Sequence, residues 1–164
     1  MKKQRKLLLP LLAALFFAAC GPKTLVDQQH DFPNNTWPRF DAPAKFSFDC
    51  TDVESFFNIT ISAVVDTARY RQNGLPLTLQ LQSPNGEQRT LFCDIVLRNY
   101  QGTWLGEFDE NGLLHVSQAV RQYYSFNNAG KYHLDISQRT NKHPILGIHS
   151  IHLNIQEAQM KYPE

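Results

Sequence analysis

Apolar and polar residues alternate with a period of two through most of the chain beyond residue 44. The alternation is regular over residues 57–65, 75–82, 91–97, 132–136 and 151–155. Successive side chains of a strand point to opposite faces of a sheet, so this period is typical of strands with one buried face. The pattern therefore predicts a series of half-buried strands.

Turn sequences separate these segments. Residues 83–86, 109–112 and 127–130 read Ser-Pro-Asn-Gly, Asp-Glu-Asn-Gly and Asn-Asn-Ala-Gly, and such residues fix or tolerate the backbone angles of tight turns. Residues 118–124 fit either a turn of helix or a strand. Short strands joined by turns predict an all-β fold, a single antiparallel β-sandwich with jelly-roll-like or Greek-key connections, in preference to a barrel.

The first nineteen residues have a different pattern. Basic residues at positions 2–6 precede an apolar run over residues 7–19, and the run stops at Cys20. This is typical of a secretory signal peptide and is shorter than the ~20 residues that a membrane-spanning helix needs. Small residues directly before a cysteine indicate lipoprotein processing, although Phe17 departs from the usual pattern. We expect residues 1–19 to be removed and Cys20 to carry acyl chains that anchor the protein in a membrane; the alternative is an ordinary secreted protein.

The segment that follows lacks a regular pattern. Residues 20–44 carry four prolines, and proline fixes φ and removes a hydrogen-bond donor. We therefore predict a lipid-anchored tether over residues 20–44, with Trp37 and Phe40 docking on a β-sandwich domain that spans residues 45–164.

Loss of the signal peptide changes the charge of the protein. The full chain has 16 Lys and Arg against 15 Asp and Glu, and removal of the four basic residues of the signal leaves 12 basic residues. No basic cluster remains, whereas phosphate binding needs several cations on one face. Nucleic acid is therefore not expected as a partner.

The six histidines lack the spacing of a metal or catalytic site. His149 and His152 are three positions apart, which in a strand places them on opposite faces. His133 and Asp135 share one face, and we interpret them as solvated rather than as a catalytic histidine oriented by a carboxylate. Nucleophile-elbow, zinc-protease and phosphate-loop motifs are absent from the sequence. We expect no enzymatic activity, no cofactor and no small-molecule substrate.

Two cysteines remain besides Cys20. Cys50 and Cys93 both occupy the apolar phase of an alternating segment, so both are predicted to point into the core. In an oxidising envelope such a pair is a candidate disulfide. The alternative is that each thiol is a small buried hydrophobic group of low reactivity.

Oxygen and aromatic side chains give two further candidate sites. Residues 107–111 could offer oxygen ligands to calcium, but their spacing is that of a solvated hairpin turn, and we predict no metal. Trp104, Tyr123 and Tyr124 near Asn127 could stack against a glycan, although core packing explains aromatic residues at strand spacing better.

One short motif concerns modification. Asp66-Thr67-Ala68 resembles the O-glycosylation acceptor pattern of Bacteroidota envelope proteins, which makes Thr67 a candidate O-glycosylation site. A polar strand end is the alternative interpretation.

Five stretches form a further pattern: Trp37 soon after Cys20, the leucine-rich strand and turn of residues 75–86, Gly-Thr-Trp-Leu-Gly at residues 102–106, residues 126–132, and Leu-Gly-Ile at residues 146–148. Together they resemble the GldH-type gliding motility lipoproteins of Bacteroidota. The chain departs from the family at His149, where an acidic residue is usual.

The resemblance implies a non-enzymatic envelope lipoprotein associated with gliding motility and the type IX secretion apparatus. Its partners would be the membrane, through the lipid, and other gliding or secretion lipoproteins or envelope proteins. Residues 21–24 lack an acidic cluster, which favours the periplasmic side of the outer membrane. The alternative function is that of a lipid-anchored carbohydrate-binding module.

Overall fold

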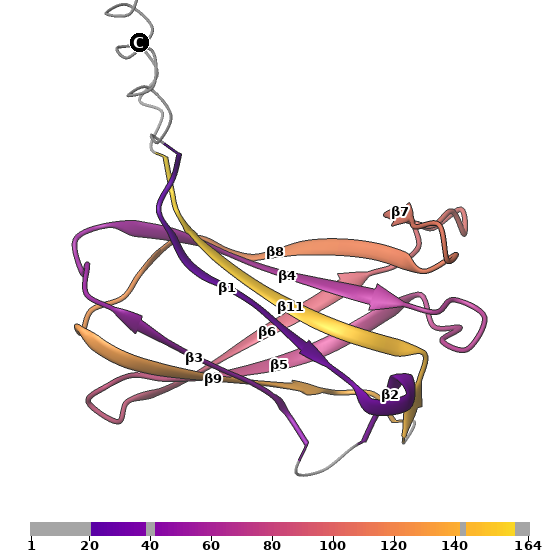
Figure 1. The fold of residues 1–164 in the computed structure, drawn as a ribbon, viewed down its shortest axis with the longest axis horizontal. Coiled ribbons are helices and arrows are strands. Elements are labelled where there is room, and N and C mark those ends of the chain that lie inside the picture. The colour runs from indigo at the N-terminus through magenta and orange to yellow at the C-terminus, as the bar shows by residue number, and fades with distance from the viewer. Residues whose placement is uncertain (1–20, 39–41, 142–143, 160–164) are drawn as a thin grey trace, which may run out of the picture.

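The chain forms two antiparallel β-sheets packed face to face (Figure 1). The computed structural model describes residues 21–38, 42–141 and 144–159. The five-stranded sheet contains, in spatial order, β1 (Thr24–Asp31), β11 (Ile148–Glu157), β4 (Phe56–Val65), β8 (Leu114–Ser125) and β7 (Glu107–Phe108). The four-stranded sheet contains, in order, β3 (Ala44–Cys50), β9 (Gly130–Gln138), β5 (Gly74–Gln82) and β6 (Gln88–Val96). A short ladder joins β2 (Thr36–Trp37) to β10 (Ile145–Leu146), and η2 (Pro33–Asn35) is a 3-10 turn.

The strand order is that of a jelly roll. Leaving out the three two-residue strands, the first strand pairs with the last, and the chain changes sheet at most connections, with β5 and β6 joined as a hairpin. This arrangement of eight antiparallel strands in two sheets confirms the predicted all-β sandwich and its jelly-roll-like connections. Among the described residues no helix is long and apolar enough to span a bilayer.

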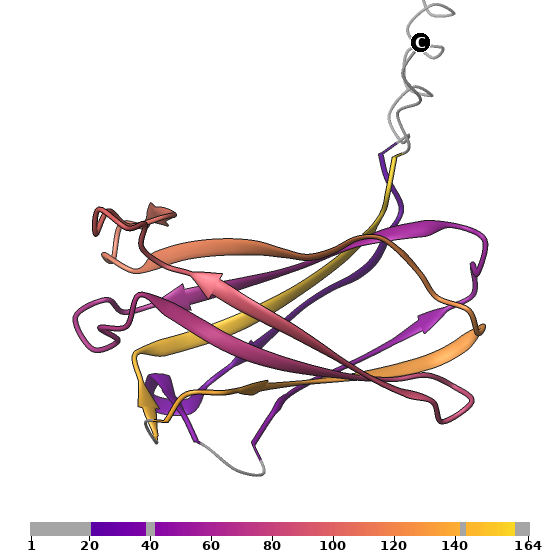
Figure 2. The same ribbon diagram turned by 180° about the vertical axis from the view of Figure 1, so that it is seen from behind.

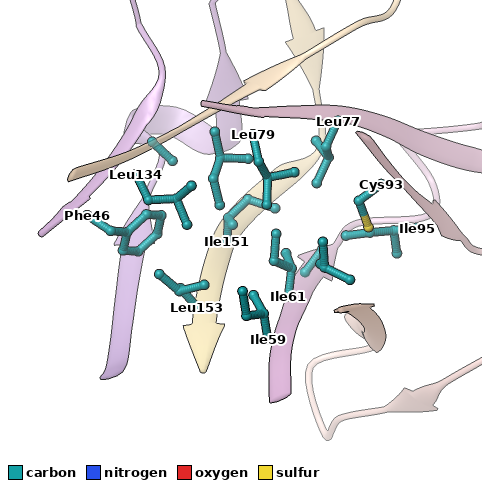
Figure 3. Close-up of a cluster of buried hydrophobic side chains, with 14 of the residues drawn as sticks. Phe46, Ile59, Ile61, Leu77, Leu79, Cys93, Ile95, Leu134, Ile151 and Leu153 are labelled. Atoms are coloured by element: carbon teal, nitrogen blue, oxygen red, sulfur yellow. The ribbon is translucent and has the colours of Figure 1, made fainter. Parts of the chain in front are cut away.

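The core fills the space between the two sheets (Figure 3). The apolar phase of each predicted strand points inward, and the buried side chains of the two sheets meet in one cluster. Figure 3 shows Leu79 and Leu134 of the four-stranded sheet facing Ile151 and Leu153 of the five-stranded sheet. Each fully buried side chain of this size contributes about 1.5–3 kcal/mol relative to exposure, so the period-two pattern accounts for much of the fold.

The structure contradicts the predicted tether over residues 24–37. Strand β1 pairs along its length with β11, and Val26 is buried. Trp37 is fully buried and stacks on Phe32 with 4.3 Å between ring centroids, so the predicted docking of Trp37 is confirmed, while Phe40 lies outside the described residues. The segment looks irregular in sequence because β1 is an edge strand whose residues are mostly polar and exposed.

Residues 118–124 are part of a strand. They belong to β8, whose pairing with β4 shifts register twice near Ile59. Each shift breaks the period of two, which is why the sequence pattern allows both a helix and a strand. The predicted turn at residues 83–86 joins β5 to β6, with Gly86 at φ 86°.

Candidate functional site

The loop between β6 and β8 lies at one end of the sandwich (Figure 2). Together with the last residue of β6, it carries four of the nine exposed large apolar side chains of the described residues. Val96, Tyr100, Leu105 and Phe108 are 45%, 95%, 41% and 49% exposed. We call these four residues the β6–β7 apolar patch. Phe92, 60% exposed, lies on the same outer face of β6 as Val96, four residues earlier in the strand.

A compact turn holds Tyr100 at the tip of this loop. The Oδ1 atom of Asn99 accepts hydrogen bonds from the backbone N–H groups of Gln101 and Thr103, at 3.0 and 2.9 Å. The backbone N–H of Asn99 in turn donates to the carbonyl of Thr103 at 2.9 Å. The turn is therefore ordered by its own polar groups, and the Tyr100 ring is left almost entirely in solvent.

Arg98 and Trp104 form the base of the loop. Their backbones meet in an isolated β-bridge, and the Arg98 guanidinium lies 3.5 Å from the centroid of the Trp104 ring. The Trp104 ring also contacts Phe108 edge-on at 6.3 Å, and the backbone N–H of Leu105 donates to the carbonyl of Leu97 at 2.8 Å. This cation–π stack and the backbone bonds bring Val96, Leu105 and Phe108 together.

A hollow of about 790 Å³ on the outer face of the five-stranded sheet adjoins the patch. Val96 and Leu105 form part of its wall, and its floor includes Ser62 and Ser117, whose hydroxyl groups are 2.7 Å apart. Polar side chains of β1, β8 and β11 line the rest, among them Gln29, His115 and His152. The site thus combines an apolar wall with a floor of hydroxyl, amide and imidazole groups.

The two histidines of the hollow are each paired with a carboxylate. His115 Nε2 lies 3.0 Å from Asp109 Oδ2, and His152 Nε2 lies 2.6 Å from Asp27 Oδ1. Both pairs are exposed to water, and surface pairs of this kind are worth little energy. Ser62 is the cross-strand neighbour of His152, but among the described residues its hydroxyl is hydrogen-bonded to Ser117 and not to a histidine.

The acidic loop of residues 107–111, considered above as a calcium site, contains the hairpin turn between β7 and β8, and Asp109 stabilises that turn. Oδ1 of Asp109 accepts hydrogen bonds from the backbone N–H groups of Asn111 and Leu113, both at 2.9 Å. The Leu113 bond and, after it, the His115 contact hold the pKa of the Asp109 carboxyl below its usual range. No group of three metal-ligating side chains comes together anywhere in residues 21–38, 42–141 and 144–159.

The predicted disulfide between Cys50 and Cys93 is wrong. Both thiols are buried and free, and the buried-hydrophobe alternative is the one that the structure supports. Burial raises the pKa of Cys50 and raises that of Cys93 to about 11. A thiol with a raised pKa is a poor nucleophile at neutral pH.

The other predicted residues lie apart from one another. His133 and Asp135 are on the outer face of the four-stranded sheet, as expected. Thr67 is half-buried in the turn after β4, where the Asp66 carbonyl accepts from the Arg69 and Tyr70 N–H groups; its glycosylation stays a prediction. Residues 1–19 and Cys20 lie outside the described residues, so their processing also stays a prediction.

The predicted aromatic platform is not assembled. Trp104 contacts Phe108, whose strand pairs with the first residues of β8, whereas Tyr123 and Tyr124 lie near the last residues of β8. A strand rises about 3.3 Å per residue, so the length of β8 separates these rings by roughly 30 Å.

Sequence reasoning missed the β6–β7 apolar patch. The sequence of β6 did contain a sign of this patch. Leu91, Cys93 and Ile95 occupy the inward positions of the alternation. Phe92 and Val96 are apolar although they occupy outward positions, where polar residues are expected. Apolar residues in the polar phase of an alternating strand mark an exposed contact surface.

Comparisons with known proteins give one family match. The sequence model described as "GldH lipoprotein" matches residues 24–155. A comparison with curated proteins returns no match. Among solved structures, a chain of the complex of Aeromonas sobria serine protease with its chaperone ORF2 is similar at 11% identity and a TM-score of 0.39. The match covers 92% of the present chain and 29% of the Aeromonas chain.

Proposed function

Because this chain belongs to the GldH lipoprotein family, a family of lipid-anchored envelope proteins of gliding motility, we propose that it is a non-enzymatic binding subunit. It would be anchored through Cys20, most favourably on the periplasmic side of the outer membrane. Its β6–β7 apolar patch would bind a second envelope protein of the motility and type IX secretion machinery.

The observation that carries this proposal is the clustering of the patch. Single exposed apolar residues are ordinary on protein surfaces, whereas a contiguous group marks a contact site. Tyrosine and phenylalanine are also favoured at protein interfaces because a rigid ring buries a large area at low entropic cost. The ordered base under Tyr100 adds to this, since a preorganised loop loses little entropy on binding.

Features of the described residues also support a role without catalysis. The two buried thiols have raised pKa values. Among the described residues the carboxylate-paired histidines are not hydrogen-bonded to the neighbouring serines, whose hydroxyls are bonded to each other. Enzyme sites more often combine perturbed acids, bases and nucleophiles in one cleft.

The patch can be tested in the envelope of producing cells. A photo-crosslinking residue in place of Leu105, itself 41% exposed, should capture a motility or secretion protein. Tyr100→Asp combined with Phe108→Asp in that background should abolish both capture and gliding. Both side chains are solvent-exposed, so the double variant should fold and reach the membrane normally.

A matched control is available on the opposite sheet. His133→Ala combined with Asp135→Ala changes two polar residues of the outer face of the four-stranded sheet and should leave capture and gliding intact. Unchanged capture by the patch variant would refute the proposed contact site. Loss of function in the folded, anchored control would move the functional surface to that sheet face.

The hollow beside the patch favours carbohydrate binding as a second candidate function. Its hydroxyl, amide and imidazole groups could hydrogen-bond sugar hydroxyls, although the predicted stacking platform of Trp104, Tyr123 and Tyr124 is not present. Retention of the protein on purified envelope glycans, and loss of that retention in Ser62→Asp or Ser117→Asp, would support this candidate over the protein partner.

A further inference from the structure

Figure 1 shows the end of the sandwich where the described chain begins, where β4 starts and β8 ends. A second group of exposed apolar residues belongs to this end. Val53, Phe56 and Tyr123 are 38%, 37% and 54% exposed, and we call them the anchor-side rim. We propose that this rim contacts the headgroup layer of the membrane in which the acyl chains of Cys20 are inserted. The inference rests on the proposed lipidation of Cys20.

Two of the rim residues, Phe56 and Tyr123, lie near each other because β4 and β8 are neighbours in one sheet. Phe56 opens β4 and is paired with Ser125 of β8. The backbone N–H of Tyr123 donates to Oδ1 of Asn58 at 3.2 Å, which joins β8 to the start of β4. Val53 lies in the loop that leads into β4.

The start of the chain is joined to the same corner. The backbone N–H of Glu157 donates to the Lys23 carbonyl at 2.8 Å, and that of Ala158 donates to the Phe56 carbonyl at 2.7 Å. Thr24 and Phe57 both flank the end of β11, so they are two strand spacings, or about 10 Å, apart.

The short link to the lipid limits where the domain can lie. Only residues 21–23 separate Cys20 from β1, and this length of extended chain spans at most about 14 Å. The rim is therefore within reach of the headgroups while the domain is anchored. The β6–β7 apolar patch lies at the other end of β8 and is directed away from the link.

The backbone at Tyr123 keeps its ring in solvent. Its φ of 55° is an uncommon and costly conformation for an aromatic residue. The Asn58 hydrogen bond supports this conformation, and the next residue, Tyr124, is half-buried against the core. Tyrosine with an apolar ring and a polar tip is favoured at the boundary between lipid and water.

The charges beside the rim indicate the kind of surface it contacts. Asp52, Glu54 and Glu157 lie in or against the loop, where the Ser55 hydroxyl lies 2.8 Å from Asp52 and 3.1 Å from Glu157 and shares one proton between them. Lys23 and Arg121, the latter two residues before Tyr123, are neighbouring cations. Excess negative charge disfavours an anionic surface and favours a zwitterionic one. Shallow contact with zwitterionic headgroups is thus the expected mode.

The test uses the full, lipidated chain reconstituted in phosphatidylcholine vesicles with brominated acyl chains, which quench nearby tryptophan. The parent is Trp104→Phe, in which the fully buried Trp37 is the remaining tryptophan and supplies the reference spectrum. After subtraction of that spectrum, Phe56→Trp and, separately, Tyr123→Trp should show a blue-shifted emission and loss of intensity. Phe108→Trp, at the patch end, is the matched control and should add the emission of a water-exposed tryptophan.

Three outcomes would overturn the inference, and they are distinguishable. A mass spectrum without acyl chains at Cys20 would refute the proposed lipidation and, with it, the membrane contact. Acylated protein with unquenched tryptophan at both rim positions would refute the rim contact alone. Quenching at position 108 in place of the rim would show that the domain lies with its other end on the membrane.

Discussion

Gly147 lies so close to Tyr70 that a β-carbon at position 147 would come within 2.9 Å of the Tyr70 amide nitrogen. The same β-carbon would also meet the carbonyl of Asp66 at 2.9 Å, and the φ of Gly147 is 90°. The contact joins the start of β11 to the turn after β4, where the Asp66 N–H donates to the Gly147 carbonyl at 2.8 Å. The glycine is therefore required both for its backbone angle and for the space it leaves.

Gly147→Ala should destabilise the domain by about 2–4 kcal/mol, the sum of a left-handed backbone and an overpacked contact. Gly86→Ala is the matched control, because Gly86 has a φ of 86° but no atom within 4 Å of an added β-carbon. Its cost should be the backbone penalty alone, about 1 kcal/mol. Urea denaturation of both variants measures the difference, and equal losses would contradict the close approach.

The two buried thiols should behave as free and unreactive groups. In a Cys20→Ser variant, an added reductant should leave the melting temperature unchanged, because Cys50 and Cys93 are separated by strands β9 and β5. Three strand spacings separate the α-carbons by about 14 Å across the sheet, and Cys50 lies opposite Gly130 whereas Cys93 is in register with Gln138, about 26 Å further along β9. Both separations exceed the roughly 7 Å that a bridge allows. A lower melting temperature after reduction would contradict this sheet order.

The reactivity of Cys93 should depend on pH in a defined direction. Its pKa is raised from 9.0 to about 11, so the fold favours the neutral thiol. This contribution to stability is complete below pH 9 and is lost as the pH rises towards 11. At pH 8 iodoacetamide should label Cys93 roughly 100-fold more slowly in folded than in unfolded protein, the ratio of thiolate fractions. Equal labelling rates would show that the thiol is accessible and ionised.

The last strand should tolerate charge on one face only. Leu153 is fully buried in β11, and the adjacent Asn154 points to the outer face. Leu153→Asp would bury an unpaired carboxylate and should cost more than about 4 kcal/mol, so that the protein is lost from the envelope. Asn154→Lys, which places a cation opposite Asp27 of β1, should change stability by no more than about 0.5 kcal/mol. Circular dichroism and the amount of protein in membranes measure both effects.

Acid should loosen the hairpin that precedes β8. The Leu113 N–H and the His115 ring hold the pKa of Asp109 below 3.8, so the ionised carboxylate is favoured in the fold. The contribution of the ionised carboxylate to the free energy of unfolding is present above pH 3.8. It is lost as the pH falls through the lower pKa that Asp109 has in the folded protein. A carboxyl titration followed by NMR should give a midpoint below 3.8, and Asp109→Asn should make stability less dependent on pH in this range. A midpoint above 3.8 would contradict the hydrogen-bond arrangement.

Much of the fold could be predicted because burial of one strand face is a local property of sequence. The alternations at residues 75–82 and 132–136 identify both the strand and its inward side. Strand β1 could not be predicted in this way, because an edge strand needs few apolar residues and its partner, β11, is more than a hundred positions away. The two register shifts of β8 are likewise set by its neighbour β4 and not by its own pattern.

The candidate site could be predicted from the sequence less well than the fold. Candidate chemistry is usually sought in titratable side chains, and those side chains proved to serve turns or to face solvent. Tyr100 and Leu105 do not belong to any periodic segment, and their proximity to Val96 depends on the bridge between Arg98 and Trp104. The one signal in the sequence was the apolar character of Phe92 and Val96 on the polar side of their strand.

The pairing of β1 with β11 determines when the protein can finish folding. Asp27 and His152, which meet across these strands, are 125 positions apart in sequence, and such distant contacts form slowly because a long loop must close first. Strand β1 therefore stays unpaired until β11 is available, and an unpaired strand edge is prone to aggregate. Because Thr24 is paired with Gln156, the five-stranded sheet cannot be completed before almost all of the described chain has been made.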